Sequence, residues 1–317
     1  MENNSSISEF LLLEFSAALE LQILHFILFL VLYLVTVTGN LLIIAAIAFD
    51  HHLHTPMYFF LMNLAMQDIG SVSVIIPKAM MNSIMNIRLI SYSGCVAQVL
   101  LVVFFLASDV AVLTVMAYDR YVAICNPLQY EILMNRTACT QMMVSAWISS
   151  LLYAMLHTGG TFASPFCSNV VDQFFCEIPH LLKLACSDLH QIEIGAVLFS
   201  FVITLGCFVF IVVTYISIFS AVLKIPSVQG RKKAFSTCLP HLIVFSTFLF
   251  TVCFAYLRPT SERSSYLDLA FTMIYSIVPP LINPVIYSMR NTDMKNALSR
   301  LLGMRQSLMD TFSKFVL

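Results

Sequence analysis

The sequence predicts an all-α membrane protein, a bundle of seven transmembrane helices with a short amphipathic helix after the last span. Three observations support this fold class. The 317 residues are 59% hydrophobic and only 10% charged, whereas a soluble domain is typically about a quarter charged. Seven apolar runs each reach the roughly 20 residues needed to cross a bilayer. Lipid supplies no hydrogen bonds to the backbone, so runs of this length are expected to be helical.

The seven runs follow one another without an internal repeat, a low-complexity tract or a soluble insertion, which predicts a single domain over residues 1–317. The charged segment after the last run predicts the amphipathic helix at about 291–302. The predicted spans are 23–49, 57–81, 96–119, 139–158, 195–223, 235–257 and 267–289.

Basic residues predict the orientation in the membrane. Cytoplasmic loops carry an excess of Lys and Arg, and an extracellular N-terminus places eleven of the sixteen basic residues on the cytoplasmic side. Because the number of spans is odd, the C-terminus is then cytoplasmic. Asn3 and Asn4 each begin an N-x-Ser glycosylation sequon, which suits an extracellular N-terminus.

The nine cysteines divide according to this topology. Cys95, Cys167, Cys176 and Cys186 fall outside, where disulfides form, and four cysteines can pair in three ways. The other five lie within helices or at the cytoplasmic side, and we expect them to be reduced thiols: Cys125, Cys139, Cys207, Cys238 and Cys253.

The net charge and the absence of certain motifs exclude several classes of function. A net charge of −1 gives no electrostatic basis for binding nucleic acid or an acidic substrate. The sequence has no GxSxG, no HExxH and no glycine-rich phosphate loop, so no enzyme is predicted. His51, His52 and His54 lie in a short polar loop, where we expect them to be solvated rather than bound to metal.

Two acidic residues, Asp68 and Asp109, fall well inside predicted spans, away from the ends of those spans. An acid within the membrane is costly and normally faces the bundle interior. The pair could share a Na⁺ ion or a proton, because hard cations take oxygen ligands and close like charges favour protonation. Alternatively, each acid could be hydrogen-bonded separately and specify helix packing. The acids could also mark the ion path of a transporter or channel, although transporters usually show repeated halves.

Helix geometry relates Asp109 to the stretch "MAYDRYVAIC". Eleven residues separate Asp109 from Arg120, which at about 100° per residue is three turns and about 20°. The two therefore share a helix face, with Val102 and Leu106 toward the outside and Arg120 about 16 Å below Asp109. Asp119 precedes Arg120, but adjacent helical residues do not face each other well. From helix geometry alone, we expect Asp119 to hold the Arg120 side chain only weakly.

Five strings carry a family resemblance. They are "GN" (39–40), "LHTPMYFFL" (53–61), "MAYDRYVAIC" (116–125), "KAFSTC" (233–238) and "PLINPVIYSMRN" (280–291). In this order and spacing the chain resembles an odorant receptor of the tetrapod, class II type, within the rhodopsin-like (class A) G-protein-coupled receptors. The resemblance covers nearly the whole chain.

The resemblance implies a receptor that binds a small odorant within the helix bundle and activates a stimulatory, olfactory-type G protein to raise cAMP. It also implies a multi-pass protein in contact with membrane lipid, at the plasma membrane of olfactory cilia. The implied pocket positions are overwhelmingly apolar and uncharged, which suits a hydrophobic ligand with one or two polar atoms. They are Val102, Val103, Leu106, Ala107, Phe199, Ser200, Ile203, Val252, Tyr256 and Ser276.

For activation, the resemblance implies that Asp119 engages Arg120 in the inactive receptor and releases it to the G protein. Pro284 lacks a backbone donor and gives the last span a place to bend. The implied coupling residues are Asp119, Arg120, Tyr121, Tyr215, Asn283, Pro284 and Tyr287. The implied ion or proton site comprises Asn40, Asp68, Asp109 and Asn283.

The resemblance further implies the pairs Cys95–Cys176 and Cys167–Cys186, the first of which would roof the pocket. The sequence departs from the family pattern at three positions. Leu249 stands where a Tyr is usual, Pro240 where a Ser is usual, and Asp109 where a Glu is usual. These departures bear on the details of activation in the sixth span, not on the fold.

Overall fold

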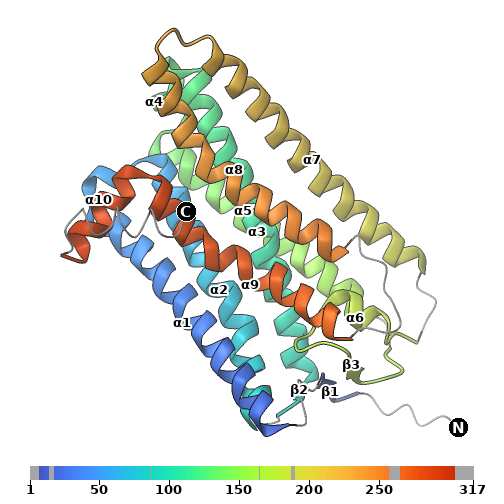
Figure 1. The fold of residues 1–317 in the computed structure, drawn as a ribbon. Coiled ribbons are helices and arrows are strands. Elements are labelled where there is room, and N and C mark those ends of the chain that lie inside the picture. Colours follow the sequence, from blue (N-terminus) through green and yellow to red (C-terminus); the bar gives the residue numbers. More distant parts are fainter. Residues whose placement is uncertain are drawn as a thin grey trace, which may run out of the picture.

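The computed structural model describes residues 7–13, 18–85, 87–163, 165–186, 190–256 and 265–303. In this part of the chain, seven long helices run roughly side by side as one elongated bundle (Figure 1). Each overlaps a predicted span, with ends that differ by at most seven residues, which confirms the fold class. The helices are α1 (Leu19–Phe49), α2 (Pro56–Met85), α3 (Tyr92–Cys125), α5 (Arg136–Phe162), α7 (His190–Leu223), α8 (Val228–Tyr256) and α9 (Ser265–Arg290).

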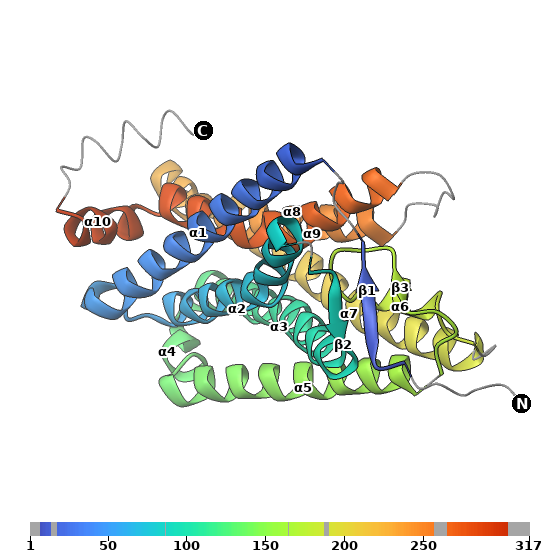
Figure 2. The same cartoon turned by 90° about the horizontal axis from the view of Figure 1, so that it is seen from below.

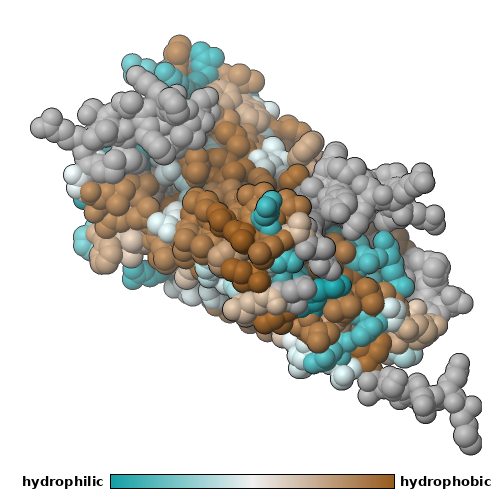
Figure 3. Space-filling view, turned by 60° about the horizontal axis from the view of Figure 1, so that its bottom comes forward, coloured by the Kyte–Doolittle hydropathy of each residue, from teal (hydrophilic) through white to brown (hydrophobic). Residues whose placement is uncertain are grey.

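The hydrophobic character of the helices fits a membrane. Among the described residues, five helices are long and apolar enough to cross one: α1, α2, α3, α5 and the Leu198–Leu223 part of α7. Hydrophobic side chains cover most of the face shown in Figure 3, and many large ones on α1, α5 and α7 are exposed. Such exposure would be costly in water but is expected where lipid surrounds the bundle.

Short elements lie at one end of the bundle, which by the predicted topology is the cytoplasmic end. They are two 3₁₀ turns (His51–Leu53 and Pro127–Gln129), α4 (Tyr130–Leu133) and α10 (Thr292–Leu301). Helix α10 confirms the predicted amphipathic helix, because Met294, Ala297 and Leu298 form one buried stripe at helical spacing.

A pair of charges joins α10 to the first cytoplasmic turn. The guanidinium of Arg300 donates to the carboxylate of Asp50. This hydrogen bond holds the pKa of Asp50 below its usual value. The guanidinium of Arg300 is exposed and the carboxylate of Asp50 is half-buried, so solvent screens the pair and we expect it to contribute little to stability.

A small three-stranded sheet, which was not predicted, covers the opposite end of the bundle. Strand β1 (Glu9–Leu12) lies between β2 (Leu89–Ser91) and β3 (Val170–Val171). It runs antiparallel to β2 and parallel to β3. The chain near the N-terminus therefore forms the central strand of a roof at this end, as both views of the ribbon show (Figures 1 and 2). Strands this short carry too little alternation to be recognised from sequence.

Two disulfides lie in the same roof and confirm both implied pairs. The Cα atoms of Cys95 and Cys176 are 5.6 Å apart, and those of Cys167 and Cys186 are 5.0 Å apart. The first disulfide ties the loop before α7 to the start of α3. The free cysteines Cys125, Cys139, Cys207 and Cys238 are as expected; the side chain of Cys253 lies outside the described residues.

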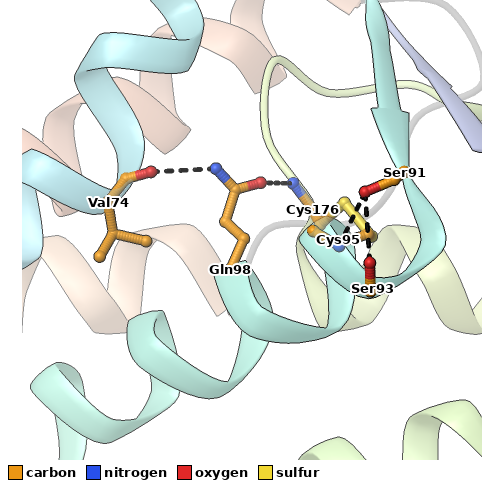
Figure 4. Close-up of a disulfide and its surroundings, with 7 residues drawn as sticks. Val74, Ser91, Ser93, Cys95, Gln98 and Cys176 are labelled. Atoms are coloured by element: carbon orange, nitrogen blue, oxygen red, sulfur yellow. Dashed lines mark hydrogen bonds between the residues drawn. A yellow bond between two sulfur atoms is a disulfide. The ribbon is translucent and has the colours of Figure 1, made fainter.

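The amide of Gln98 joins this disulfide to the bundle (Figure 4). Its nitrogen donates to the carbonyl of Val74 in α2 at 3.1 Å, and its oxygen accepts from the backbone N–H of Cys176 at 2.8 Å. One buried side chain thereby satisfies a loop amide that has no sheet partner. The roof is held to α2 and α3 by hydrogen bonds as well as by the covalent bond.

A substitution of Phe10 would test whether the central strand β1 is needed for folding. Its ring is fully buried and packs 5.9 Å from the ring of Tyr92 and 5.3 Å from that of Phe166, measured between centroids. Replacing a buried Phe by Ala typically costs about 3–5 kcal/mol. We expect Phe10→Ala to lower the amount of folded receptor at the cell surface, measured by flow cytometry. Glu9→Ala, at an exposed position of the same strand, is the matched control, and equal surface levels for the two variants would contradict a structural role for β1.

Candidate functional site

The cytoplasmic end of α3 holds a buried ion pair. Asp119 is fully buried, and its Oδ2 accepts from Nε of Arg120 at 2.9 Å and also from the Arg120 terminal nitrogen. Although adjacent side chains on a helix diverge, the long guanidinium arm folds back onto its neighbour. The predicted engagement of Arg120 by Asp119 is therefore present in this structure.

Tyr130, in α4, reinforces the pair and was not found from the sequence. Its hydroxyl donates to Asp119 Oδ1 at 2.8 Å, the carboxylate oxygen farther from Arg120. Burial, and then the charge of Asp119, raise the pKa of Tyr130, so the hydroxyl remains a donor at all physiological pH values. The ion pair of Asp119 and Arg120 is therefore supported by a residue outside α3. The spacing of residues within α3 could not predict this contact.

His241 links three helices near the same level, and sequence reasoning missed it as well. From α8, its Nδ1 lies 2.7 Å from the Tyr215 hydroxyl on α7 and its Nε2 lies 2.9 Å from the Leu113 carbonyl oxygen on α3. A carbonyl only accepts, so in the neutral imidazole Nε2 carries the proton and Nδ1 accepts from Tyr215. An ionisable residue within a span is a signal for function, and His241 could have been singled out on that ground.

A small cavity lies between these residues. It is lined by Arg120, His241, Tyr287, Met57 and Met116, among others, and its volume of about 10 Å³ is about that of one water molecule. The buried hydroxyl of Tyr287 has no hydrogen-bond partner in the described part of the chain. A helix is about 10 Å across, so a partner's helix does not fit here. Beside Arg120, the structure therefore leaves no space for a partner's helix.

The intramembrane acids each have an amide partner. The nitrogen of Asn283 donates to both carboxylate oxygens of Asp68, at 3.0 and 3.2 Å, and so joins α9 to α2. Gln67 joins α2 to Asp109 on α3: in the amide orientation that satisfies all partners, its nitrogen donates to Asp109 Oδ1 at 3.0 Å. Its oxygen then accepts from Trp147 Nε1 on α5 at 2.9 Å. Gln67 and Trp147 were not among the predicted site residues.

Asn40 supports the same region without contacting the acids through a hydrogen bond. Its nitrogen donates to the carbonyl oxygens of Thr36 at 3.0 Å and Pro280 at 3.1 Å. The Pro280 carbonyl needs this donor, because its helical partner would be the N–H that Pro284 lacks. Gly39 allows the approach, since a Cβ there would lie only 3.2 Å from the Cβ of Pro284. Of the four predicted ion-site residues, the structure directly joins Asp68 and Asn283.

The structure brings only some of the predicted ligand-binding residues close together. Val102 packs against a buried cluster containing Phe174 and Phe175, and Val103 packs against the cluster around the Cys95–Cys176 disulfide. Leu106 packs against the large core cluster, and Ala107 is half-buried. All four α3 positions are apolar and half-buried.

The remaining ligand positions differ in their surroundings. Phe199 and Ile203 on α7 are 46% and 42% exposed, so other side chains do not close over them. Ser200 contacts Tyr153 and His157 on α5, with oxygen–oxygen and oxygen–nitrogen distances of 2.8 and 2.9 Å. The Ser276 hydroxyl donates to the Thr272 carbonyl. The side chains of Val252 and Tyr256 lie outside the described residues.

The comparisons with known proteins decide the family. The sequence profile of the olfactory receptor family matches residues 29–305. The chain belongs to the olfactory receptor family. Human olfactory receptor 14I1 is 49% identical over 302 residues, which are 95% of this chain and 97% of the relative. Human olfactory receptor 14C36 is 48% identical over 303 residues, again 95% and 97% of the two chains.

The fold comparison agrees with the family. The crystal structure of squid rhodopsin matches with a TM-score of 0.73 over 90% of this chain and 81% of the other, at 17% sequence identity. The resemblance drawn from the five strings and the seven-helix fold are therefore confirmed. The olfactory receptor is a multi-pass membrane protein of the G-protein-coupled class, and it is not an enzyme.

A double-mutant cycle tests the link through His241. His241→Phe leaves the Tyr215 hydroxyl unpaired in the core, at a cost of about 1–3 kcal/mol, and Tyr215→Phe removes the donor to Nδ1. Because the double variant removes both partners, we expect its thermal-unfolding midpoint to fall by clearly less than the sum of the two single decreases. Tyr118→Phe, whose hydroxyl has no hydrogen-bond partner among the described residues, serves as control. Additive decreases would contradict the direct contact.

Proposed function

We propose that this olfactory receptor binds a small, largely hydrophobic odorant in the outer half of its bundle and activates a stimulatory, olfactory-type G protein to raise cAMP. The observation that carries the proposal is the pairing of Arg120 with Asp119, whose other carboxylate oxygen accepts from Tyr130, beside a small cavity. A buried, engaged cation at the inner end of a membrane helix is a two-state element, because a partner that competes for it stabilises the released form.

The arrangement of α3 supports communication between the two ends. Val102 and Leu106 lie beneath the roof on the same helix that carries Asp109 and Arg120. A ligand that displaces α3 or α8 strains the contact between His241 and Leu113, and that contact lies close to the Arg120 cavity. Ligand binding would then favour a state in which the cavity opens to the G protein.

The proposed orientation has an extracellular N-terminus and a cytoplasmic C-terminus, at the plasma membrane of olfactory cilia. The two disulfides and strand β1 share one end of the bundle, and disulfides form on the oxidising side of the membrane. The proposed glycosylation of Asn3 or Asn4 belongs to the same side, although both residues lie outside the described ones.

Replacing Arg120 tests the function. We expect Arg120→Ala to abolish odorant-evoked cAMP in cells that contain the olfactory-type G protein, using an agonist found by screening hydrophobic odorants on the wild type. Surface expression should persist, and Arg136→Ala, at an exposed position at the start of α5, should respond normally. A normal response by Arg120→Ala would refute the role of Arg120. An agonist-evoked membrane current in place of cAMP would instead favour the channel or transporter alternative for Asp68 and Asp109.

We further propose that Asp68 and Asp109 hold a Na⁺ ion or a proton in the inactive receptor. Carboxylate and amide oxygens are the ligands that hard cations take, and the buried Oδ1 of Asn283 has no hydrogen-bond partner among the described residues. That orphaned oxygen belongs to the amide that already contacts Asp68, so the residues present fit a small cation.

Sodium dependence tests this site. If Na⁺ binds only the inactive state, a concentration ten times its dissociation constant should raise the half-maximal agonist concentration by about tenfold. Asp68→Asn should remove the dependence, measured as agonist dose–response in membranes with Na⁺ or an organic cation. Asp50→Asn is the control for loss of a carboxylate outside the bundle. A Na⁺ effect that survives in Asp68→Asn would refute the site.

A further inference from the structure

A groove opens on the side of the bundle between α3, α5 and α7. Its volume is about 610 Å³, within the range of sites that hold small ligands. Its wall on α3 is formed by Ala111, Thr114 and Val115, and its far side by Cys207 on α7. The α5 wall extends from Ala138 to Ser149, eleven residues or about 16 Å of helix.

The groove faces the membrane and not the bundle interior. On α3, the neighbouring residues Val112 and Leu113 point into the core and are buried, whereas Thr114 and Val115 are only half-buried. On α5, Gln141 and Ser145 are exposed. Both helices are candidate membrane spans, so the groove opens toward the hydrocarbon region of the bilayer.

The lining combines small apolar residues with uncharged polar ones. Gln141, Ser145 and Ser149 are spaced four residues apart and therefore lie along one face of α5. The hydroxyls of Thr114 and Ser149 donate to carbonyls of their own helices. In the described part of the chain, the Gln141 amide and the Ser145 hydroxyl have no hydrogen-bond partner. An unpaired polar group in hydrocarbon is costly, so these two groups favour an occupant that brings a hydroxyl.

We propose that the groove is a binding site for a membrane sterol. A sterol is uncharged, carries one hydroxyl at the end of a rigid flat body, and enters from the bilayer. Its hydroxyl would pair with Gln141, the polar residue nearer the cytoplasmic end of α5, or with Ser145. Its ring system would lie on the small side chains Ala146 and Ala111.

The charge of the lining favours a sterol over a phospholipid. No Lys or Arg lines the groove, and a phosphate headgroup is normally matched by such cations. A second copy of the receptor is the other occupant of comparable shape. It would have to place a polar side chain opposite Gln141 and Ser145, and its presence is an outcome of the experiment below.

The thiol of Cys207 reports directly on occupancy. We would place the full-length receptor in phosphatidylcholine nanodiscs with or without cholesterol and measure alkylation by a membrane-permeant maleimide, using mass spectrometry. Cholesterol at ten times its dissociation constant should slow the alkylation of Cys207 by about tenfold. The half-buried Cys125, which does not line the groove, is the internal reference.

Two matched variants test whether cholesterol protects Cys207 by binding in the groove. Ser145→Phe fills the groove, so Cys207 should react at one slow rate whether or not cholesterol is present. Ile148→Phe adds similar bulk at an exposed position of α5 outside the lining and should keep the wild-type dependence on cholesterol. A photoactivatable cholesterol should label α3 or α5 in the wild type and in Ile148→Phe, but not in Ser145→Phe.

Three outcomes would overturn the proposal. Cholesterol could leave the reactivity of Cys207 unchanged, or it could slow Cys207 and Cys125 equally, which is a general effect of the bilayer. Alternatively, oxidation could join Cys207 of one copy to Cys207 of another, which would show that a second receptor occupies the groove. None of these readouts depends on odorant binding or cAMP, so they are independent of the proposed signalling function.

Discussion

The carbonyl oxygen of Pro280 illustrates the constraint on which the whole bundle depends. Pro284 removes the backbone donor that this oxygen would have in a regular helix, and lipid cannot replace it. Asn40 supplies the missing donor from α1, and Gly39 lets the two helices come close enough for it to do so. The same rule explains Asp68 with Asn283, Asp109 with Gln67, and His241 with Tyr215. In each of these pairs, a polar group inside the membrane finds its partner on another helix, and the hydrogen bond holds the two helices together.

Helix α3 is the element through which the two ends of the receptor are related. Its first turns carry Cys95 and Gln98, which hold the roof, and its last turns carry Asp119 and Arg120. Between them, Asp109 and the Leu113 carbonyl receive side chains from α2 and α8. A helix of 34 residues is about 50 Å long, so α3 extends from the roof to the pair of Asp119 and Arg120.

The helices could be predicted closely because membrane insertion makes hydropathy a direct measure of where a helix lies. The predicted spans and the seven long helices differ mainly where helices continue into the polar regions, as α3 does beyond Asp119 to Cys125. The disulfide pairs followed from the family resemblance, since the sequence alone left three pairings open. The roof strands could not be predicted, because β1 becomes a strand only when β2 and β3 flank it. Phe10 and Leu12 are buried by that tertiary arrangement.

The sequence by itself determined the number and approximate length of the spans and the presence of costly acids within the membrane. These properties depend on composition along a short stretch of chain, which a linear pattern records. Only the tertiary structure decided that Tyr130 supports Asp119, that His241 links three helices, and that Gln67 and Trp147 accompany Asp109. Such partners come from distant parts of the chain, as with Asn40 and Pro280, 240 residues apart. A hydrogen bond depends on distance and direction in space, and helix packing sets both.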